Sequence, residues 1–330
     1  MTELAIIVAT RDRSIALRRL LASAVAMAGW ERLKPEIIVV DDGPSDGTRL
    51  VVAEVARHAS GVRYLPVPSG GKTRALNRGI RATDASLLAF VDDDVELDAG
   101  WLLAVSDYAS RLRFDAAQGA IRLPPDSAGN PAVIAAIDRW RTIPGCDLGP
   151  GVTEVESLIG ANMLIWRSTF ARVGLFDERL GPGAAGFGDD SELADRIRGV
   201  GGRIGYVPDA VVYHYVDPTR LSAEYFRAFH TRRGLSRIYY KRTGSWRVLP
   251  NLGLAAMRLA LATIAALPNL RLRALGHWYH YRAMLAATRV TPLAGGVPRL
   301  EEARTLPKNV RFAAQEQLAA KPEEALKQTQ

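Results

Sequence analysis

The sequence predicts an α/β fold, in which a doubly wound sheet occupies about the first two thirds of the chain and a helical region follows. Apolar runs rich in β-branched residues alternate with segments of helical periodicity between residues 4 and 92. Several of these runs end in polar or acidic residues, as expected where the carboxyl ends of parallel strands meet at one edge of a sheet. After residue 222 the pattern is helical as far as Pro292.

The predicted elements begin in βα order, with strands at 4–10, 36–42, 62–67 and 87–92 and helices at 14–27, 46–57 and 73–82. Asp46 and Thr48 are candidate caps of the second helix. The later elements are a helix from 101, a strand at 116–123, a Pro- and Gly-rich stretch at 123–151, a strand at 157–166, a Gly-rich loop at 181–188, a helix at 190–199 and a strand region at 203–214.

Composition narrows the class of protein. The chain has 330 residues, of which 48% are hydrophobic and 24% are charged, a balance too apolar for a disordered chain and too polar for a multi-span membrane protein. The single cysteine, Cys146, excludes an intrachain disulfide and a cysteine zinc site. The chain begins with a strand-like segment and shows no secretory signal, so we expect a cytoplasmic location.

Positive charge is concentrated near the end of the chain. Residues 217–290 contain 13 Lys and Arg against 2 Asp and Glu, so that this segment carries the excess behind the net charge of +8. Such a segment is expected to face phosphate groups, from nucleic acid, anionic lipid or a phosphorylated substrate. Within it lies the apolar stretch 249–267, bounded by Pro250 and Pro268. We weigh three interpretations of this stretch: a membrane span, a buried helix and, as the leading one, an interfacial helix with basic flanks.

Three acidic motifs follow apolar runs. They are V-V-D-D-G-P-S-D-G-T at 39–48, F-V-D-D-D at 90–94 and G-D-D-S-E-L at 188–193. Carboxylates that follow buried strands gather at the carboxyl edge of a sheet, so we expect the three motifs to share one crevice. Asp92 and Asp94 are spaced to direct oxygens at one hard divalent ion such as Mg²⁺ or Mn²⁺. A solvated acidic turn is the simpler alternative for this motif.

Together these motifs and the βα alternation resemble family 2 glycosyltransferases over residues 4–215. The resemblance implies a GT-A type fold, a doubly wound mixed sheet with a Rossmann-like nucleotide-binding half. It also implies a glycosyltransferase domain at 1–216, with a nucleotide-binding half at 1–100 and an acceptor half at 101–216. From composition and pattern, we expect a basic helical region at 217–294, a candidate for membrane association, and a polar mobile tail at 295–330.

The resemblance also assigns roles to individual residues. Asp190 matches the catalytic base, and Asp189 stands beside it where the family motif has Glu. Asp92, Asp94 and His214 match metal ligands. The implied nucleotide and donor contacts are Thr10, Arg11, Arg13, Asp41, Asp42, Lys72, Arg74, Asn77, Asp92 and Asp93. The implied acceptor contacts are Asn162 and Trp101.

The expected function is therefore inverting transfer of a sugar from a nucleoside-diphosphate sugar, with Mg²⁺ or Mn²⁺, in cell-surface polysaccharide or glycoconjugate synthesis. The expected acceptor is a glycan or a lipid-linked saccharide, presented at the inner face of the cell membrane, and nucleic acid is not an expected partner. Two alternatives stay open. One is a sugar nucleotidyltransferase of related fold, and the other is a non-catalytic protein that binds membranes or polyanions.

Overall fold

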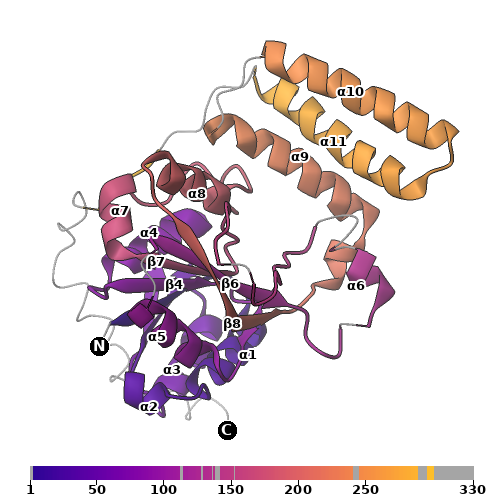
Figure 1. Ribbon diagram of the computed structural model, residues 1–330. Coiled ribbons are helices and arrows are strands. Elements are labelled where there is room, and N and C mark those ends of the chain that lie inside the picture. Colours follow the sequence, from indigo (N-terminus) through magenta and orange to yellow (C-terminus); the bar gives the residue numbers. More distant parts are fainter. Residues whose placement is uncertain are drawn as a thin grey trace, which may run out of the picture.

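One mixed sheet of eight strands organises the protein (Figure 1). The computed structural model describes residues 3–111, 114–127, 129–135, 137, 142–151, 153–240, 245–288 and 296–300. The strands are β1 Leu4–Thr10, β2 Glu36–Asp42, β3 Val62–Val67, β4 Leu87–Val91, β5 Val95–Leu97, β6 Ala116–Arg122, β7 Asn162–Trp166 and β8 Ile204–His214. Their order across the sheet is β3-β2-β1-β4-β7-β6-β8-β5.

The first half of the sheet is parallel, and the second half is mixed, because β7 and β5 run opposite to the other strands. Strands β3, β2, β1 and β4 pair in parallel, and Thr10 lies opposite Asp41 where β1 and β2 end. Strand β7 is antiparallel to both β4 and β6, while β6 and β8 are parallel. This mixed α/β sheet confirms the predicted fold class, and it brings the ends of β1, β2 and β4 to one edge.

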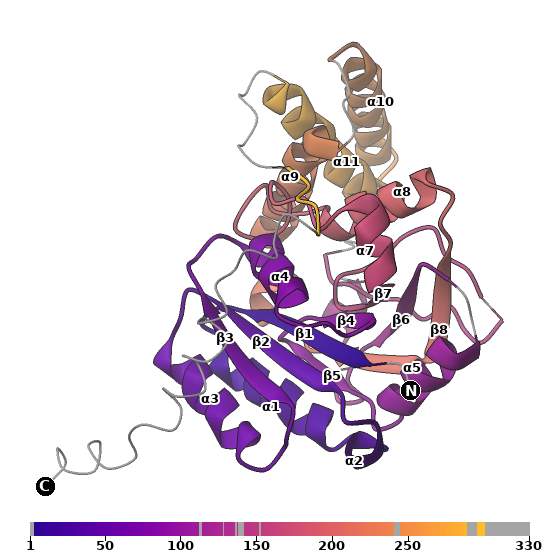
Figure 2. The ribbon, with the colours of Figure 1, turned by 90° about the vertical axis from the view of Figure 1, so that its left-hand side faces the viewer.

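Helices cover both faces of the sheet (Figure 2). The helices of this domain are α1 Ser14–Val25, α2 Trp30–Leu33, α3 Asp46–Ala56, α4 Lys72–Arg81, α5 Trp101–Arg111, α7 Arg167–Val173 and α8 Asp189–Gly199, and the short helix α6 Pro131–Ala135 lies to one side of the sheet in Figure 1. Because side chains alternate along a strand, Ile6 packs in the core beneath α1 and α3, and Ile7 packs in the core beneath α4 and α8. Each face therefore has its own hydrophobic core.

Three long helices follow the sheet: α9 Ala223–Tyr240, α10 Ser245–Ile264 and α11 Pro268–Ala287. Figure 1 shows α9 between the sheet domain and the pair α10 and α11. Val248, Ala255 and Ala262 recur every seven residues on the buried side of α10, which packs on α11. The opposite side of α10 is exposed, so the interpretation of this segment as a buried helix is wrong.

The boundaries of some elements differ from the prediction. Helix α10 continues through Pro250, which we expected to precede it. Proline there removes one intrahelical hydrogen bond, near an exposed part of the helix where water can replace it. The predicted strand at 157–166 begins only at Asn162. The cap of α3 is Ser45, whose hydroxyl accepts the Thr48 N–H, so the caps predicted at Asp46 and Thr48 are wrong.

The chain segment 296–300 returns to the sheet domain. Leu175 N–H donates to Pro298 O at 2.8 Å, and Glu178 N–H donates to Gly296 O at 3.0 Å. These residues are therefore an exception to the mobile tail predicted at 295–330, and residues 301–330 lie outside the described part of the chain.

Candidate active site

Two carboxylates and one imidazole meet at the carboxyl edge of the sheet. Asp92 follows the buried strand β4, and Asp94 precedes β5. Because β5 pairs with the end of β8, Val95 lies opposite His214. Asp92, Asp94 and His214 each offer one ligand atom, and these atoms lie within 4.8 Å of one another. The structure therefore brings together the three residues that the sequence suggested as metal ligands.

Three buried polar atoms in this cluster have no hydrogen-bond partner among the described residues. They are both ring nitrogens of His214 and Oδ1 of Asp94, and His214 Nε2 lies 3.4 Å from Asp94 Oδ1. Burial lowers the pKa of His214, which keeps the ring neutral and a nitrogen lone pair available. An unpaired ring nitrogen of His214 therefore lies beside an unpaired carboxylate oxygen of Asp94. Nitrogen and oxygen atoms placed in this way are suitable ligands for a divalent cation.

Basic side chains surround the cluster. Arg13 Nη1 lies 2.8 Å from Asp93 and 3.0 Å from Asp94, and Arg220 Nη2 lies 3.3 Å from Asp94. Lys72 forms an ion pair with Asp92. Burial alone would raise the pKa of Asp92, but the Lys72 ammonium holds it below its usual value. The edge thus combines metal-ligand chemistry with three cations suited to phosphate oxygens.

The third acidic motif forms the start of α8. Gly188 precedes the helix in a left-handed conformation, with φ of 90°, which glycine adopts without strain. Asp190 Oδ2 accepts the Gly160 N–H at 3.1 Å, and Asp190 Oδ1 accepts the Ser191 N–H at 2.6 Å. A Cβ added to Gly160 would lie 3.3 Å from Lys72 Nζ and 4.0 Å from Asp190 Oδ2. Lys72 therefore lies between Asp190 and the Asp92 side of the metal-ligand cluster.

Asp189 is buried beside this ion pair. Burial, reinforced by the neighbouring Asp190 carboxylate, raises the pKa of Asp189 from 3.8 to about 6. Because the folded-state pKa lies above the unfolded value, the native state binds the proton more tightly. The free energy of unfolding therefore falls as the pH rises between these two values, and the loss is complete above pH 6.

Replacing Asp189 by asparagine should remove this loss. We expect the free energy of unfolding of D189N, measured relative to that of wild type, to be higher at pH 7.5 than at pH 4 by up to about 3 kcal/mol. Urea unfolding of the protein without nucleotide or metal measures the difference. D195N, on the same helix with a side chain 40% exposed, is the matched control for the loss of one carboxylate from this helix. An equal stability difference at both pH values for D189N would contradict this account of Asp189.

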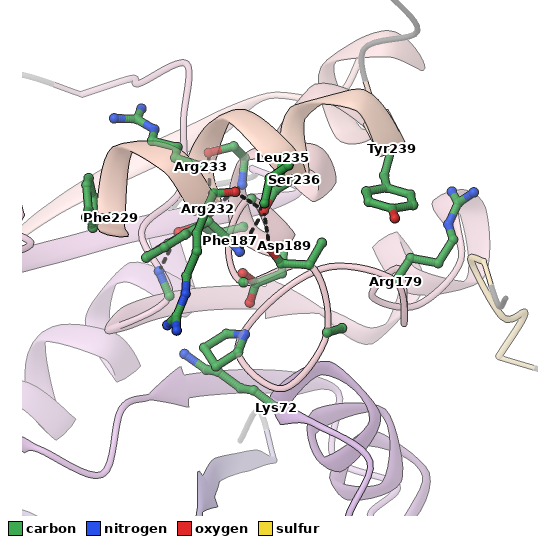
Figure 3. Close-up of a pocket in the computed structure, with 18 of the residues that line it drawn as sticks. Lys72, Arg179, Phe187, Asp189, Phe229, Arg232, Arg233, Leu235, Ser236 and Tyr239 are labelled. Atoms are coloured by element: carbon green, nitrogen blue, oxygen red, sulfur yellow. Dashed lines mark hydrogen bonds between the residues drawn. The ribbon is translucent and has the colours of Figure 1, made fainter. Parts of the chain in front are cut away.

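A large cleft opens beside these residues (Figure 3). Its volume is about 2040 Å³, and its lining includes Lys72, Asp92 and Asp190 from the sheet domain. Residues of α9 form the opposite wall, among them Phe229, Arg232 and Tyr239. The candidate base and one candidate metal ligand, Asp92, therefore face one cavity, which the C-terminal helices help to enclose.

Five of the expected nucleotide and donor contacts, those implied for the nucleoside, lie outside the lining of this cleft, at or just after the ends of β1 and β2: Thr10, Arg11, Arg13, Asp41 and Asp42. Thr10 donates to Asp93 at 2.7 Å, and Arg11 donates to Ser69 at 2.9 Å. Asp41 Oδ2 accepts the Ser45 N–H and the Tyr64 hydroxyl, each at 2.9 Å, whereas its buried Oδ1 has no partner. Arg74 lies 3.3 Å from Glu178 on a neighbouring loop.

Four expected ligand contacts hold the fold together. Asn162 and Trp101 are fully buried and bonded to each other at 3.1 Å, so neither faces an acceptor. Asn77 is also fully buried, with its amide bonded to both backbone groups of Phe176. Asp42 accepts the N–H groups of Gly70 and Gly71 and so fixes the loop before Lys72. As direct contacts of a ligand, the predictions for Asn162, Trp101 and Asn77 are wrong, whereas that for Asp42 stays a prediction.

Sequence reasoning missed two arginines that the fold brings to the cleft. Arg220 follows β8 on a short 3-10 helix, and Arg232 lies on α9. Both belong to the basic segment 217–290, so the concentration of positive charge did predict that this region faces phosphate groups. No spacing pattern distinguished these two from the other 11 cations there.

Comparison with known sequences gives a consistent picture. Residues 5–145 match the sequence model of the family described as "Glycosyl transferase family 2". An "N-acetylglucosaminyl-diphospho-decaprenol L-rhamnosyltransferase" of Mycobacterium tuberculosis is 31% identical over 210 residues, covering 54% of this chain and 66% of that protein. The "Succinoglycan biosynthesis protein ExoM" of Rhizobium meliloti is 24% identical over 282 residues, covering 84% and 89%. The chain thus matches slightly less than two thirds of the rhamnosyltransferase's length.

Comparison with solved structures supports the fold. A mannosyltransferase from Pyrobaculum calidifontis, solved with GDP-Man and Mn²⁺, superposes with a TM-score of 0.59 at 21% identity and 87% coverage of both chains. TarS of S. aureus, residues 1–349 with UDP-GlcNAc, gives a TM-score of 0.54 at 13% identity and covers 87% and 92%.

Proposed function

Since this chain belongs to glycosyltransferase family 2 through residues 5–145, we propose that it transfers a sugar, with inversion, from a nucleoside-diphosphate sugar to a saccharide carried on a lipid diphosphate. One observation carries this proposal. The candidate base, Asp190, and one member of the cluster suited to a divalent ion, Asp92, face the same cleft, and Lys72 pairs with Asp92 beside them.

The proposed metal ligands are Asp92, Asp94 and His214. The unpaired buried atoms of Asp94 and His214 support this assignment, as does the Mn²⁺ in the mannosyltransferase of similar fold. Mn²⁺ or Mg²⁺ bound there would act as a Lewis acid that neutralises charge developing on the departing nucleoside diphosphate.

The side chains around the cleft have distinct tasks in the proposed reaction. Asp190 accepts the proton of the acceptor hydroxyl, whose oxygen forms a bond to the anomeric carbon of the donor sugar. The bond from that carbon to the diphosphate breaks at the same time, and the electron pair leaves with the diphosphate. Lys72 and Arg220 are placed to stabilise this added negative charge.

The proposed acceptor class comes from the relatives. The mycobacterial rhamnosyltransferase is named for a saccharide on diphospho-decaprenol, and ExoM for succinoglycan synthesis. A soluble saccharide acceptor is the alternative for this chain. The family assignment favours sugar transfer over the nucleotidyltransferase reaction considered from the sequence.

The test is product analysis. The purified protein is incubated with Mn²⁺, a panel of nucleotide sugars and a polyprenyl-diphosphate saccharide, and the lipid product is identified by mass and anomeric configuration. We expect one sugar to be added per released nucleoside diphosphate, with inversion at the anomeric carbon. A product of retained configuration, or the absence of product with every donor, would contradict the proposal.

Delivery of a lipid acceptor requires a surface that meets the membrane, and we propose that α10 provides it at the inner face of the cell membrane. By length and composition, α10 is long and apolar enough to cross a bilayer, a test that core helices of soluble proteins also pass. Its exposed side carries Trp246, Leu249, Met257, Leu261 and Ile264 at helical spacing. Arg247 and Arg258 are exposed on the same helix. An apolar stripe with cations and tryptophan favours the interface of an anionic bilayer.

Replacing part of this stripe should release the protein from membranes. We expect wild type to sediment with anionic liposomes at low salt, and L261E/I264E to lose at least about tenfold in partitioning because charged residues oppose burial in lipid. The double variant I15E/L50E is the matched control. Ile15 and Leu50 are 85% and 61% exposed on α1 and α3, against 82% and 58% for Ile264 and Leu261. Wild type that stays in the supernatant, or equal loss in both double variants, would refute docking by α10.

A further inference from the structure

Cations that line the cleft differ in whether a carboxylate already neutralises them. Lys72, Arg179 and Arg220 form ion pairs with Asp92, Asp177 and Asp94, respectively. Among the described residues, Arg232 has neither an ion pair nor a side-chain hydrogen bond, although it faces the same cavity. An arginine without an anionic partner in a cleft is available to an anion supplied by a ligand.

Arg232 is held in a defined place relative to the candidate base. Its aliphatic stem packs on Gly186, where an added Cβ would lie 3.3 Å from Arg232 Cβ. One turn later on α9, the Ser236 hydroxyl accepts the Phe187 N–H at 3.0 Å and lies 2.8 Å from Ala185 O. The loop that leads to Asp190 is therefore tied to the helix that carries Arg232. Figure 3 shows Arg232 reaching from α9 into the cleft toward Lys72, whereas its neighbour Arg233 points to another side.

The chemistry of the cleft wall changes with distance from the sheet. Carboxylates of Asp92 and Asp190 lie at the sheet end, Arg232 lies on α9, and Leu249 and Leu285 come from α10 and α11. Figure 1 shows α10 and α11 as the helices farthest from the sheet. A lipid-linked saccharide has the same three parts in the same order: hydroxyl groups, a diphosphate and an apolar chain.

We propose that Arg232 binds the diphosphate of the lipid-linked acceptor, in a subsite separate from the metal-dependent donor site. The apolar chain then leaves along Leu249 and Leu285 toward the exposed stripe of α10, while the saccharide reaches Asp190. This inference rests on the proposed function for the identity of the acceptor. Arg232 is a binding residue, and the chemistry of transfer stays with the residues at the sheet edge.

Direct binding of a prenyl diphosphate tests this assignment without any turnover. The probe is geranylgeranyl diphosphate in neutral detergent micelles with excess chelator, which silences the metal-dependent site. We expect R232Q to raise the Kd at least about tenfold, since a charge-assisted contact to phosphate is lost, and R232K to recover part of the affinity. The matched control is R227Q on the same helix, because Arg227 lies over the ring of Tyr279, 5.8 Å from its centroid, and is absent from the cleft lining.

Two further ligands identify what the subsite recognises. Geranylgeraniol, which lacks the diphosphate, should bind wild type and R232Q equally weakly, and inorganic diphosphate should bind more weakly than the prenyl diphosphate. Nucleoside-diphosphate binding with Mn²⁺ should be unchanged in R232Q, which also confirms that the variant is folded. Equal affinity of R232Q and R227Q for the prenyl diphosphate, or equal binding of the alcohol and the diphosphate by wild type, would overturn the inference. Product formation by wild type is measured separately. The proposed function can therefore stand when the prenyl-diphosphate inference fails, and prenyl-diphosphate binding can be found when no product forms.

Discussion

Replacing Asp190 by asparagine should lower kcat by about 10²–10⁴-fold, the range that a general base typically contributes. The amide keeps the shape of the carboxylate and an oxygen for the Gly160 N–H, but it cannot take a proton from the acceptor hydroxyl. Donor affinity should therefore be nearly unchanged. Steady-state kinetics with a separate equilibrium measurement of nucleotide-sugar binding distinguish the two effects.

The matched control for D190N is D195N, on the same helix with a side chain 40% exposed and 3.6 Å from Arg198. It should keep both turnover and donor binding. If D190N loses donor affinity and turnover to the same extent, Asp190 holds the donor in place and another group is the base.

Removing the Asp94 carboxylate should have the second large effect. We expect D94A to lose at least about 100-fold in turnover and its response to added Mn²⁺, because stabilisation of charge on the leaving group is lost. The substitution also leaves His214 without its carboxylate neighbour and Arg220 without its ion pair. Activity titrated against Mn²⁺ concentration measures both losses.

E96Q is the control for D94A, because Glu96 lies on the adjoining strand β5 and accepts the Tyr215 hydroxyl at 2.8 Å, which a glutamine oxygen can still do. It should titrate with Mn²⁺ like wild type. An unchanged Mn²⁺ titration in D94A would remove Asp94 from the metal site.

The sequence was sufficient to predict which acidic residues gather at the carboxyl edge of the sheet, because these residues follow strands that are buried on both faces. Asp92 follows a strand and Asp190 lies at the start of a helix, and the hydrophobic pattern predicted both elements. Because the carboxyl ends of parallel strands meet at one edge of the sheet, we expected both carboxylates in one cleft. His214 ends a strand, but its role as a metal ligand was implied by the resemblance to family 2 glycosyltransferases and not by the hydrophobic pattern.

Residues whose roles depend on which way a side chain faces could not be predicted in this way. Asn162 begins β7 and points into the core toward Trp101, an orientation that depends on the register of β7 with its neighbours. Arg232 is one of many cations in a helical segment, and only the packing of α9 against the loop at Gly186 brings it to the cleft. Such long-range packing leaves no local signal in composition or spacing.

Binding of nucleoside diphosphates in the absence of any acceptor tests the central claim most directly, because it isolates the site formed by Asp92, Asp94 and His214. Thermal and chemical unfolding are followed with a panel of nucleoside diphosphates, with Mn²⁺ and then with excess chelator. The account predicts that at least one nucleotide at 100 times its Kd stabilises the protein by about 2.7 kcal/mol with Mn²⁺ and much less without it. Equal stabilisation in excess chelator, or no stabilisation by any nucleotide, would contradict it.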